Sequence, residues 1–451
     1  TIHFTVGHDS NVNASGGSYI AYLFAHNNND GGFGEPGDQD IIKCGSYTGN
    51  GNATGPSINL GFEPQLVLIK LASHSGENWI LMDNMRGMPV GSNDTLFELN
   101  DSGAEKSTSE ILNLTPTGFD IKSTSNGINT NTYIYAYMAI RRGGMQTPTA
   151  ASDVFAIDTH GDTAPTPPAW NSGFPVDMAI YKNITSSSGN WVLSGRLTGT
   201  KSLKTNTNES EGNDNSILFD YQNGYYDGTG SLSNFVSWMW KRARGYFDVV
   251  TYTGNDTLRT INHNLGVVPE MMWLKRRDSS DIWYVYHSAL GAGKRLTLHE
   301  TDAESSDTST MNNTAPTASV FTLNTNVNHV NANNSTYVAF LFATLAGVSK
   351  VGSYTGNAGA STINVDCGFT GDTPSFILIK ESSGTGNWWV FDSKRGIVAS
   401  TEKALYLNAT DAETSAFDYI DPYSGGFSLS TNSGINTDGA TFIFYAIAAI
   451  S

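Results

Sequence analysis

The densest group of potential metal ligands in the sequence lies in an acidic, glycine-rich stretch at 29–40. This stretch carries four carboxylates: Asp30, Glu35, Asp38 and Asp40. Ca²⁺ takes about six to eight oxygen ligands from carboxylates, amides and carbonyls, so such a loop could hold it. The spacing is not that of an EF-hand, and a solvated acidic loop is the default interpretation. Calcium is therefore the one cofactor that the sequence leaves open.

Carbohydrate binding is the second chemistry that these residues allow. A sugar stacks on an exposed aromatic ring while amides and backbone groups bind its hydroxyls. Trp170, Tyr225 and Tyr226 stand next to Asn, Gly or Asp, and they are candidates for such a contact with a glycan or a partner. Trp389 is a fourth candidate because it directly follows Trp388, and neighbours on a strand point to opposite faces. If Trp388 lies in the core, we expect Trp389 to be exposed, where it could also be a subunit contact.

No residue pattern predicts catalysis. A glycosidase needs two carboxylates that face each other across a cleft. Acidic residues such as Asp302, Glu304, Asp411 and Glu413 instead fall in corresponding turns of repeated segments, which indicates a shared structural role. The sequence lacks a nucleophile elbow between a strand and a helix, and it lacks a phosphate-binding glycine loop. We therefore predict that the protein is not an enzyme, with a polysaccharide-degrading spike enzyme as the alternative.

The elements that must position these residues recur along the chain. The stretch Gly45–Asn50 reads Gly-Ser-Tyr-Thr-Gly-Asn; it returns at 352–357 and, in part, at 252–255. A tryptophan at the start of a strand also recurs, as Trp79, Trp191, Trp283 and Trp388, and we expect all four in the core. The markers define four units, which we name unit 1 (41–142), unit 2 (152–245), unit 3 (246–346) and unit 4 (348–451). Residues 1–26 match only the last third of a unit, so we expect the tail end of an incomplete preceding unit, joined through 27–40.

Each unit is predicted to be an antiparallel β-sandwich. Short runs of Thr, Tyr, Phe, Val and Ile alternate with Gly, Asn and Asp clusters, which is typical of strands joined by turns. Strands at intervals of roughly 8–12 residues favour a sandwich over a helical or mixed fold. The fold class is therefore all-β, with tandem sandwich repeats. Cys44 and Cys367 lie at non-equivalent positions, and we expect free thiols.

Charge and hydropathy exclude two kinds of partner. The net charge is −17, with 25 Lys and Arg against 42 Asp and Glu. A nucleic-acid binder needs a basic face to neutralise phosphates, and no cluster of Lys and Arg is large enough to supply one. No segment approaches the ~20 apolar residues that cross a membrane, so we expect no membrane insertion.

Three features together resemble a known family: the marker at 353–357, the strand at 387–396 and the turn at 408–413. They are similar to tandem domains of tail-fibre and appendage proteins of marine bacteriophages. The resemblance covers essentially the whole chain, most clearly 41–142 and 246–451. Unit 2 departs furthest, because the Tyr-Thr-Gly-Asn marker is lost and prolines intrude at 165, 167 and 168. A binding site shared by all units is therefore in doubt there.

The resemblance implies a jelly-roll or concanavalin-like sandwich and a location in the extracellular virion. It implies no known reaction. By analogy with phage fibres we expect a homo-oligomer, a trimer, with other virion subunits as partners. The predicted function is that of a non-enzymatic structural and adhesive protein, which presents a surface for attachment to a host-cell glycan. A purely structural capsid or tail decoration protein is the other alternative.

Overall fold

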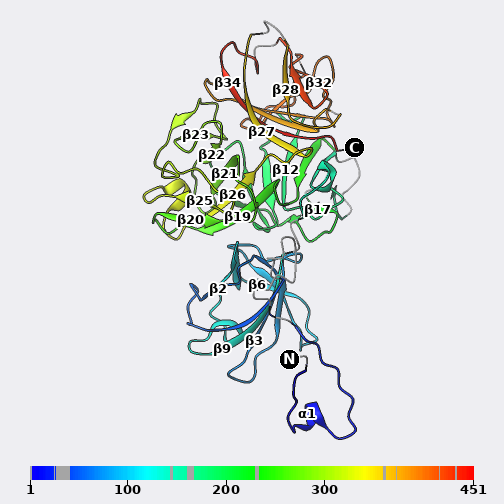
Figure 1. Ribbon diagram of the computed structural model, residues 1–451, viewed down its shortest axis with the longest axis vertical. Helices are drawn as coiled ribbons and strands as arrows, with labels where there is room; N and C mark the ends of the chain where they lie inside the picture. The colour runs from blue at the N-terminus through cyan, green and yellow to red at the C-terminus, as the bar shows by residue number, and fades with distance from the viewer. Residues whose placement is uncertain are drawn as a thin grey trace.

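A computed structural model (Figure 1) describes residues 3–24, 26, 41–142, 146–159, 167–228, 233–358, 362–371, 373–415, 417–431 and 434–450. Strands dominate these residues. The helices in the same ranges are three of four residues each, α1 (Ser10–Asn13), α2 (Asn126–Asn129) and α3 (Asn328–Asn331), and one short 3-10 helix, Ala151–Asp153. All paired strands are antiparallel, so the predicted all-β class is confirmed.

Unit 1 consists of a large and a small sheet. The large sheet has the order β1-β9-β3-β4-β5-β6. Its strands are β1 (Ile42–Thr48), β9 (Ile134–Arg141), β3 (Pro64–Leu71), β4 (Ile80–Asp83), β5 (Asp94–Glu98) and β6 (Lys106–Ser109). The small sheet β2-β8-β7 contains β2 (Ser57–Asn59), β8 (Gly118–Ile121) and β7 (Leu112–Thr115). The first strand of the unit pairs with the last, so each unit closes on itself.

Units 2, 3 and 4 repeat this order, except that the small sheet of unit 3 has two strands and the large sheet of unit 4 has five. In unit 2 the large sheet is β10 (Phe155–Thr159), β18 (Phe235–Trp240), β12 (Met178–Asn183), β13 (Val192–Gly195), β14 (Lys201–Lys204) and β15 (Gly212–Asn213), and the small sheet is β11 (Trp170–Asn171), β17 (Gly224–Asp227) and β16 (Ile217–Leu218). In unit 3 the large sheet is β19 (Phe247–Thr253), β26 (Thr336–Phe342), β21 (Met271–Arg276), β22 (Trp283–His287), β23 (Lys294–Thr297) and β24 (Ser305–Ser306), and the small sheet is β20 (Arg259–Asn262) and β25 (Val320–Leu323). In unit 4 the large sheet is β27 (Ser349–Thr355), β34 (Thr441–Ile447), β29 (Phe376–Glu381), β30 (Trp388–Asp392) and β31 (Leu405–Tyr406), and the small sheet is β28 (Ile363–Asp366), β33 (Gly426–Leu429) and β32 (Ile420–Tyr423).

The structure gives a physical reason for the recurring Gly-Asn pair. A Cβ on Gly49 would lie 2.2 Å from the carbonyl oxygen of Thr130, so only glycine allows this approach of two backbones. The next residue, Asn50, donates its backbone N–H to the Oδ1 of buried Asn129 at 2.8 Å. The same contacts recur in two other units, at Gly254 with Asn255 and Asn331, and at Gly356 with Asn357 and Asn436. The marker therefore fixes the turn that precedes the last strand.

The central strands of the large sheets in units 2, 3 and 4 are buried on both faces. In unit 3, Met272, Leu274 and Tyr284 pack inside the sandwich, whereas their neighbours Trp273 and Trp283 belong to a different core. This second core is shared between units, as aromatic contacts across their boundaries show. The centroid distances are 5.7 Å for Phe155 and Phe376, 5.5 Å for Trp240 and Phe376, and 5.1 Å for Phe342 and Tyr445.

Equivalent hydrogen bonds close units 2, 3 and 4 into a ring, which we call the three-unit ring. The Trp191 indole of unit 2 donates to the Tyr406 carbonyl of unit 4 at 2.7 Å. The Trp388 indole of unit 4 donates to the Thr297 carbonyl of unit 3 at 3.1 Å, and the Trp283 indole of unit 3 donates to the Lys204 carbonyl of unit 2 at 2.9 Å. Three buried lysines follow the same direction around the ring: Lys182 to the Thr410 carbonyl, Lys380 to that of Thr301 and Lys275 to that of Asn208. Each unit thus holds the next by the same pair of donors.

The prediction that the four repeated tryptophans lie in the core is correct for three of them and wrong for Trp79. Trp191, Trp283 and Trp388 are at most 1% exposed, and Trp79 is 44% exposed. The physical reason is the ring. In units 2 to 4 a neighbouring unit covers this face of the large sheet, and within the described chain nothing covers it in the same way in unit 1.

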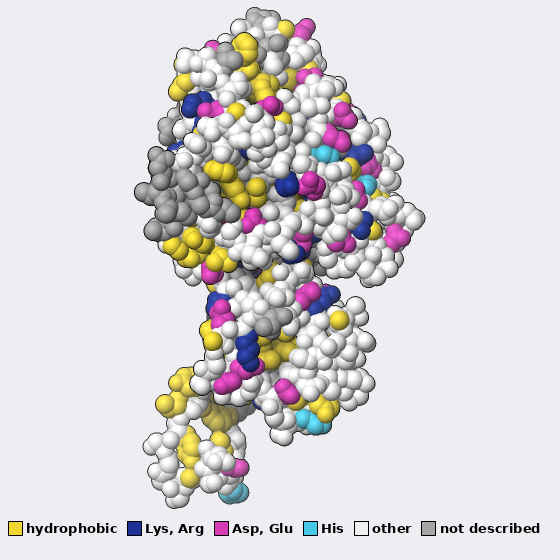
Figure 2. All heavy atoms as spheres, turned by 180° about the vertical axis from the view of Figure 1, so that it is seen from behind, with side chains coloured by type: hydrophobic (Ala, Val, Ile, Leu, Met, Phe, Trp, Pro, Cys, Tyr) yellow, Lys and Arg dark blue, Asp and Glu magenta, His cyan; other side chains and the backbone are white. Residues whose placement is uncertain are grey.

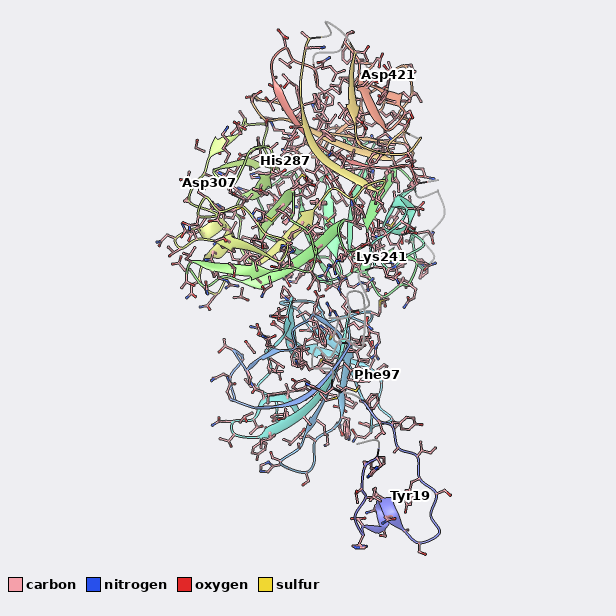
Figure 3. All side chains as sticks on the ribbon, in the orientation of Figure 1. Tyr19, Phe97, Lys241, His287, Asp307 and Asp421 are labelled. Carbon is pink, nitrogen blue, oxygen red and sulfur yellow. The ribbon has the colours of Figure 1, made fainter. Side chains whose placement is uncertain are left out.

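His287 should make the fold sensitive to acid. Its side chain is fully buried in unit 3, at the position labelled in Figure 3, and burial lowers its pKa to about 4. Its Nδ1 accepts a hydrogen bond from the Ala289 backbone N–H at 3.2 Å, which suits the neutral ring. The unfolded chain binds the proton at about pH 6.5, so stability is lost as the pH falls from about 6.5 to 4, by about 3 kcal/mol for this residue.

Urea unfolding at pH 7 and pH 4.5 measures this effect. Because carboxylates also titrate in this range, the comparison is with His287→Gln, whose stability should fall less between the two pH values. An equal fall in both proteins would show that His287 does not contribute.

Candidate functional site

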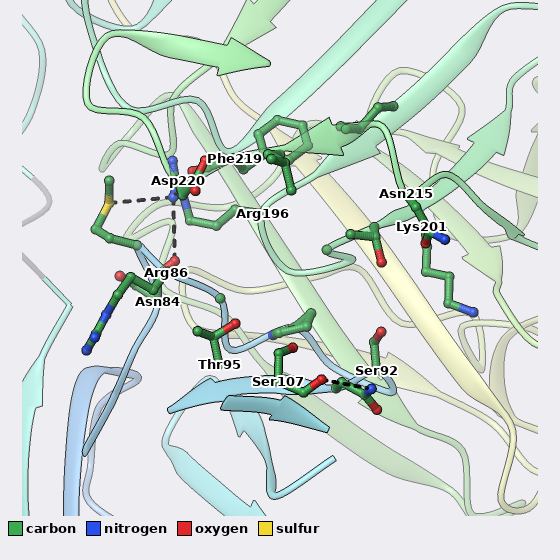
Figure 4. Close-up of a pocket in the computed structure, with 18 of the residues that line it drawn as sticks. Asn84, Arg86, Ser92, Thr95, Ser107, Arg196, Lys201, Asn215, Phe219 and Asp220 are labelled. Atoms are coloured by element: carbon green, nitrogen blue, oxygen red, sulfur yellow. Dashed lines mark hydrogen bonds between the residues drawn. The ribbon is translucent and has the colours of Figure 1, made fainter. Parts of the chain in front are cut away.

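A cleft of about 390 Å³ with mixed polar and apolar walls lies between units 1 and 2. Figure 4 shows its two walls. Unit 1 supplies the segment after β4 and the strands that follow it, with Asn84, Met85, Arg86, Gly87, Pro89, Ser92, Asn93, Thr95 and Ser107. Unit 2 supplies the turn after β13, strand β14 and the segment around β16, with Arg196, Gly199, Thr200, Lys201, Asn213, Asn215, Ile217, Leu218, Phe219 and Asp220.

Arg196 joins the two walls. It is buried, and it donates to the Phe219 carbonyl and, at 2.9 Å, to the Val176 carbonyl in its own unit. Its guanidinium also approaches the Asn84 carbonyl of unit 1 at 3.5 Å (Figure 4). Burial lowers the pKa of this guanidinium, and the nearby Asp177 carboxylate, at 3.6 Å, opposes that effect. The guanidinium of Arg196 thus bonds to groups of the protein itself, and its role is to position the walls of the cleft.

Other polar groups of the cleft face its opening. Asn213, Asn215 and Asp220 are exposed on the unit 2 wall, and Lys201 on β14 is half-buried there. Hydroxyls of Ser92, Thr95 and Ser107 lie on the unit 1 wall (Figure 4). Amides, hydroxyls, one ammonium and one carboxylate can donate to and accept from a polyhydroxylated ligand.

The cleft does not assemble a pair of catalytic carboxylates. Asp220 is the one carboxylate among its lining residues, which include neither His nor Cys. Acid-catalysed hydrolysis of a glycosidic bond uses two carboxylates on either side of the bond. What the lining residues can do is hold a polar ligand between two rigid walls.

Three of the four aromatic residues predicted as ligand contacts are core residues, so that prediction is wrong for them. Trp170 and Tyr225 are fully buried and stack with their centroids 6.2 Å apart. The Tyr225 hydroxyl lies 2.8 Å from the Ser237 hydroxyl, and burial raises the pKa of Tyr225. Trp170 and Tyr225 fill the interior of the unit 2 sandwich, where a residue next to Gly or Asn can be as buried as any other.

Trp389 is 8% exposed and not an outward-facing platform. It does point away from Trp388, as predicted, but into the unit 4 sandwich, where it packs against Tyr406 and Tyr419 at 4.8 and 4.7 Å. Trp388 faces the three-unit ring instead. Tyr226, the fourth candidate, is half-buried on β17, 6.4 Å from Tyr221.

The predicted calcium ligands Asp30, Glu35, Asp38 and Asp40 lie outside the described residues. Within the ranges that the structure does describe, His, Cys, Asp and Glu form no group of three or more that could hold a metal ion. The helices of the same ranges include none that is long and apolar enough to span a membrane.

Sequence reasoning missed the cleft because its walls come from two units. The lining Ser, Thr and Asn residues are of types that occur throughout the chain, and no spacing distinguishes them. One local signal existed: unit 2 lacks the Tyr-Thr-Gly-Asn marker and so was expected to differ from the other units.

Fold and site together define a multi-unit β-sandwich protein with a polar cleft between its first two units. A protein-family model described as a domain of unknown function, DUF7483, matches residues 1–142 and 151–450. The chain therefore belongs to this family. A search of curated proteins found no match to it.

Proposed function

We propose that this protein is a non-enzymatic structural and adhesive subunit, and that it binds a surface oligosaccharide in the cleft between units 1 and 2. The observation that carries the proposal is the cleft itself. Its volume falls within the range of ligand sites, roughly 300–1,000 Å³, and its lining offers converging amides and hydroxyls. The resemblance to phage fibre and appendage proteins supports a virion location and a host-cell glycan as the ligand.

The cleft is supported by rigid contacts between its two units. Arg242 of unit 2 makes a bidentate ion pair with Glu63 of unit 1, at 2.7 and 2.8 Å, and both side chains are buried. The Val90 backbone N–H donates to the Leu197 carbonyl at 2.9 Å. Because these contacts order both walls before a ligand arrives, binding would lose little conformational entropy.

The cleft residues also indicate a ligand class. The ammonium group of Lys201 could pair with the carboxylate of an acidic sugar. The amides of Asn213 and Asn215 could form hydrogen bonds with hydroxyl or N-acetyl groups. Leu218 is 38% exposed and offers apolar surface to the face of a pyranose ring. An oligosaccharide that contains an acidic or N-acetylated sugar fits this lining.

A glycan array followed by calorimetry on the best ligand tests the proposal. We expect Lys201→Ala and Asn215→Ala each to weaken binding about tenfold, which corresponds to one lost charge-assisted or amide hydrogen bond. Lys294→Ala is the matched control, since Lys294 begins β23 as Lys201 begins β14 but lies in unit 3. Its affinity should equal that of the unaltered chain.

Two results would contradict this function. Equal weakening by Lys201→Ala and Lys294→Ala would show attraction by surface charge without a site. Shortening of the bound oligosaccharide during incubation would favour the polysaccharide-degrading alternative.

A further inference from the structure

Unit 1 presents the same surface that units 2, 3 and 4 use to form the three-unit ring. The equivalence is visible in local hydrogen bonds. The Trp79 backbone N–H donates to the Oδ1 of Asn100 at 2.7 Å, and the Trp191 and Trp388 N–H groups donate to Asn206 and Asn408 at 2.9 and 2.8 Å. Lys70 is the last but one residue of β3 and pairs with Ala136, as Lys275 is the last but one residue of β21 and pairs with Val338. The tryptophan and lysine positions of the ring interface thus have counterparts in unit 1.

The side chains at these positions are covered in the ring and uncovered in unit 1. Trp79 is 44% exposed, against at most 1% for its three equivalents. Leu99, the residue before Asn100, is 55% exposed, whereas the residues before Asn206, His299 and Asn408 are at most 2% exposed. Leu66, Leu68, Leu81, Met138 and Ile140, on the same face of the sheet, are half-buried. Figure 2 shows hydrophobic side chains at the surface of the lower part of the molecule, where unit 1 and the N-terminal segment lie.

Unit 1 also keeps the polar groups that link neighbours in the ring. In the ring, each lysine reaches a carbonyl of its own turn and one of the next unit; Lys275, for example, donates to Asp281 and to Asn208. Lys70 donates to the Glu77 carbonyl of its own turn. In the ring, the carbonyls of Lys204 and Asn208 in unit 2 accept hydrogen bonds from Trp283 and Lys275. By their spacing from Asn100, Glu98 and Ser102 are the equivalent residues of unit 1. The donors therefore lie on β3 and just before β4, and the acceptors lie on the neighbouring strand, at the end of β5 and just after it.

A surface with donors on one side and acceptors on the other makes head-to-tail contacts, and the rotation between subunits decides whether these contacts close. In this chain the same surface closes after three units. We propose that three copies of this chain associate through unit 1, each copy contributing its unit 1 to a second ring of the same kind. The proposal goes beyond the adhesive function and does not depend on the ligand in the cleft. A trimer would also present three clefts together and so raise the avidity for a surface glycan.

Light scattering coupled to size-exclusion chromatography tests the proposal on the purified full chain. We expect a mass three times that of the chain, which is 48.4 kDa. Trp79→Ala combined with Leu99→Asp should reduce the mass to that of one chain. Both residues are largely exposed in the single chain, so the variant should keep its far-ultraviolet circular dichroism and its urea midpoint as a monomer.

The matched control is Leu258→Asp, since Leu258 is 57% exposed in unit 3 and lies outside the ring face. This variant should stay a trimer. A folded chain that remains a monomer or forms a dimer at about 100 µM would overturn the proposal. The unit 1 face would then be a binding surface for sandwich units of a different protein. A trimer that persists in the Trp79→Ala, Leu99→Asp variant would overturn it equally, because the contact would lie elsewhere.

Discussion

Replacing Arg242 with methionine is expected to lower the free energy of unfolding by about 3–5 kcal/mol, the usual cost of breaking a buried ion pair from one side. Arg242 lies where three units meet. Its Nε donates to Asp248 of unit 3 at 2.7 Å, and its two Nη atoms bind Glu63 of unit 1. Asp248 is fully buried, and Glu63 is 5% exposed. Without the guanidinium, two carboxylates would face each other without their common partner.

The carboxyl of Asp248 explains why the loss should be large. Burial would raise its pKa, but Arg242, Arg142 and the Asn264 backbone N–H together hold that pKa below its usual value. A depressed pKa contributes stability that is present above the unfolded value, about 3.9, and is lost as the pH falls through the folded value. In Arg242→Met this contribution disappears, so the variant should unfold at a higher pH during acid titration.

Urea unfolding at pH 7 measures the change, with Arg276→Met as the control. Arg276 is half-buried and pairs with the exposed Asp278 at 2.9 Å, so its loss should cost about 1 kcal/mol or less. Adding Glu63→Gln and Asp248→Asn to Arg242→Met should recover part of the stability, because the two buried carboxylates are then replaced by neutral amides. A loss below about 1 kcal/mol in Arg242→Met alone would mean that water reaches these carboxylates.

The repeated markers made the fold predictable. Tyr47, Gly49 and Asn50 each make a specific contact with the turn before the last strand. Their recurrence in the sequence therefore located equivalent units. Short strands separated by Gly, Asn and Asp then indicated sandwiches. These are local properties, and local properties can be inferred from a sequence.

The exposure of particular aromatic residues was not predictable in the same way. Alternation along β30 does separate Trp388 from Trp389, but it cannot show that the three-unit ring buries one face and the sandwich the other. A signal was nevertheless available. Runs such as 388–391 and 271–274 are apolar without interruption, which is typical of strands buried on both faces. The run 66–69 in unit 1 has the same character, in agreement with a covered face in a trimer.

Trp283→Ala is expected to lower the free energy of unfolding by about 3–5 kcal/mol, as is usual when a buried tryptophan is truncated. The side chain is fully buried in the core of the three-unit ring, with its centroid 6.4 Å from that of Phe340. Truncation would leave a cavity there and would also leave the Lys204 carbonyl without the indole donor. Leu258→Ala, at an exposed position in the same unit, should change stability by less than about 0.5 kcal/mol.

The form of the unfolding curve carries as much information as its midpoint. If the ring contacts dominate, units 2, 3 and 4 unfold in one transition, because removing any unit uncovers the faces of the other two. Trp191→Ala and Trp388→Ala should then shift that same transition by similar amounts, and the urea dependence should stay that of the unaltered chain. Circular dichroism and tryptophan fluorescence should report coincident curves. Two separate transitions, with only one moved by Trp283→Ala, would show that the sandwiches are independently stable and that the ring is a weak assembly of them.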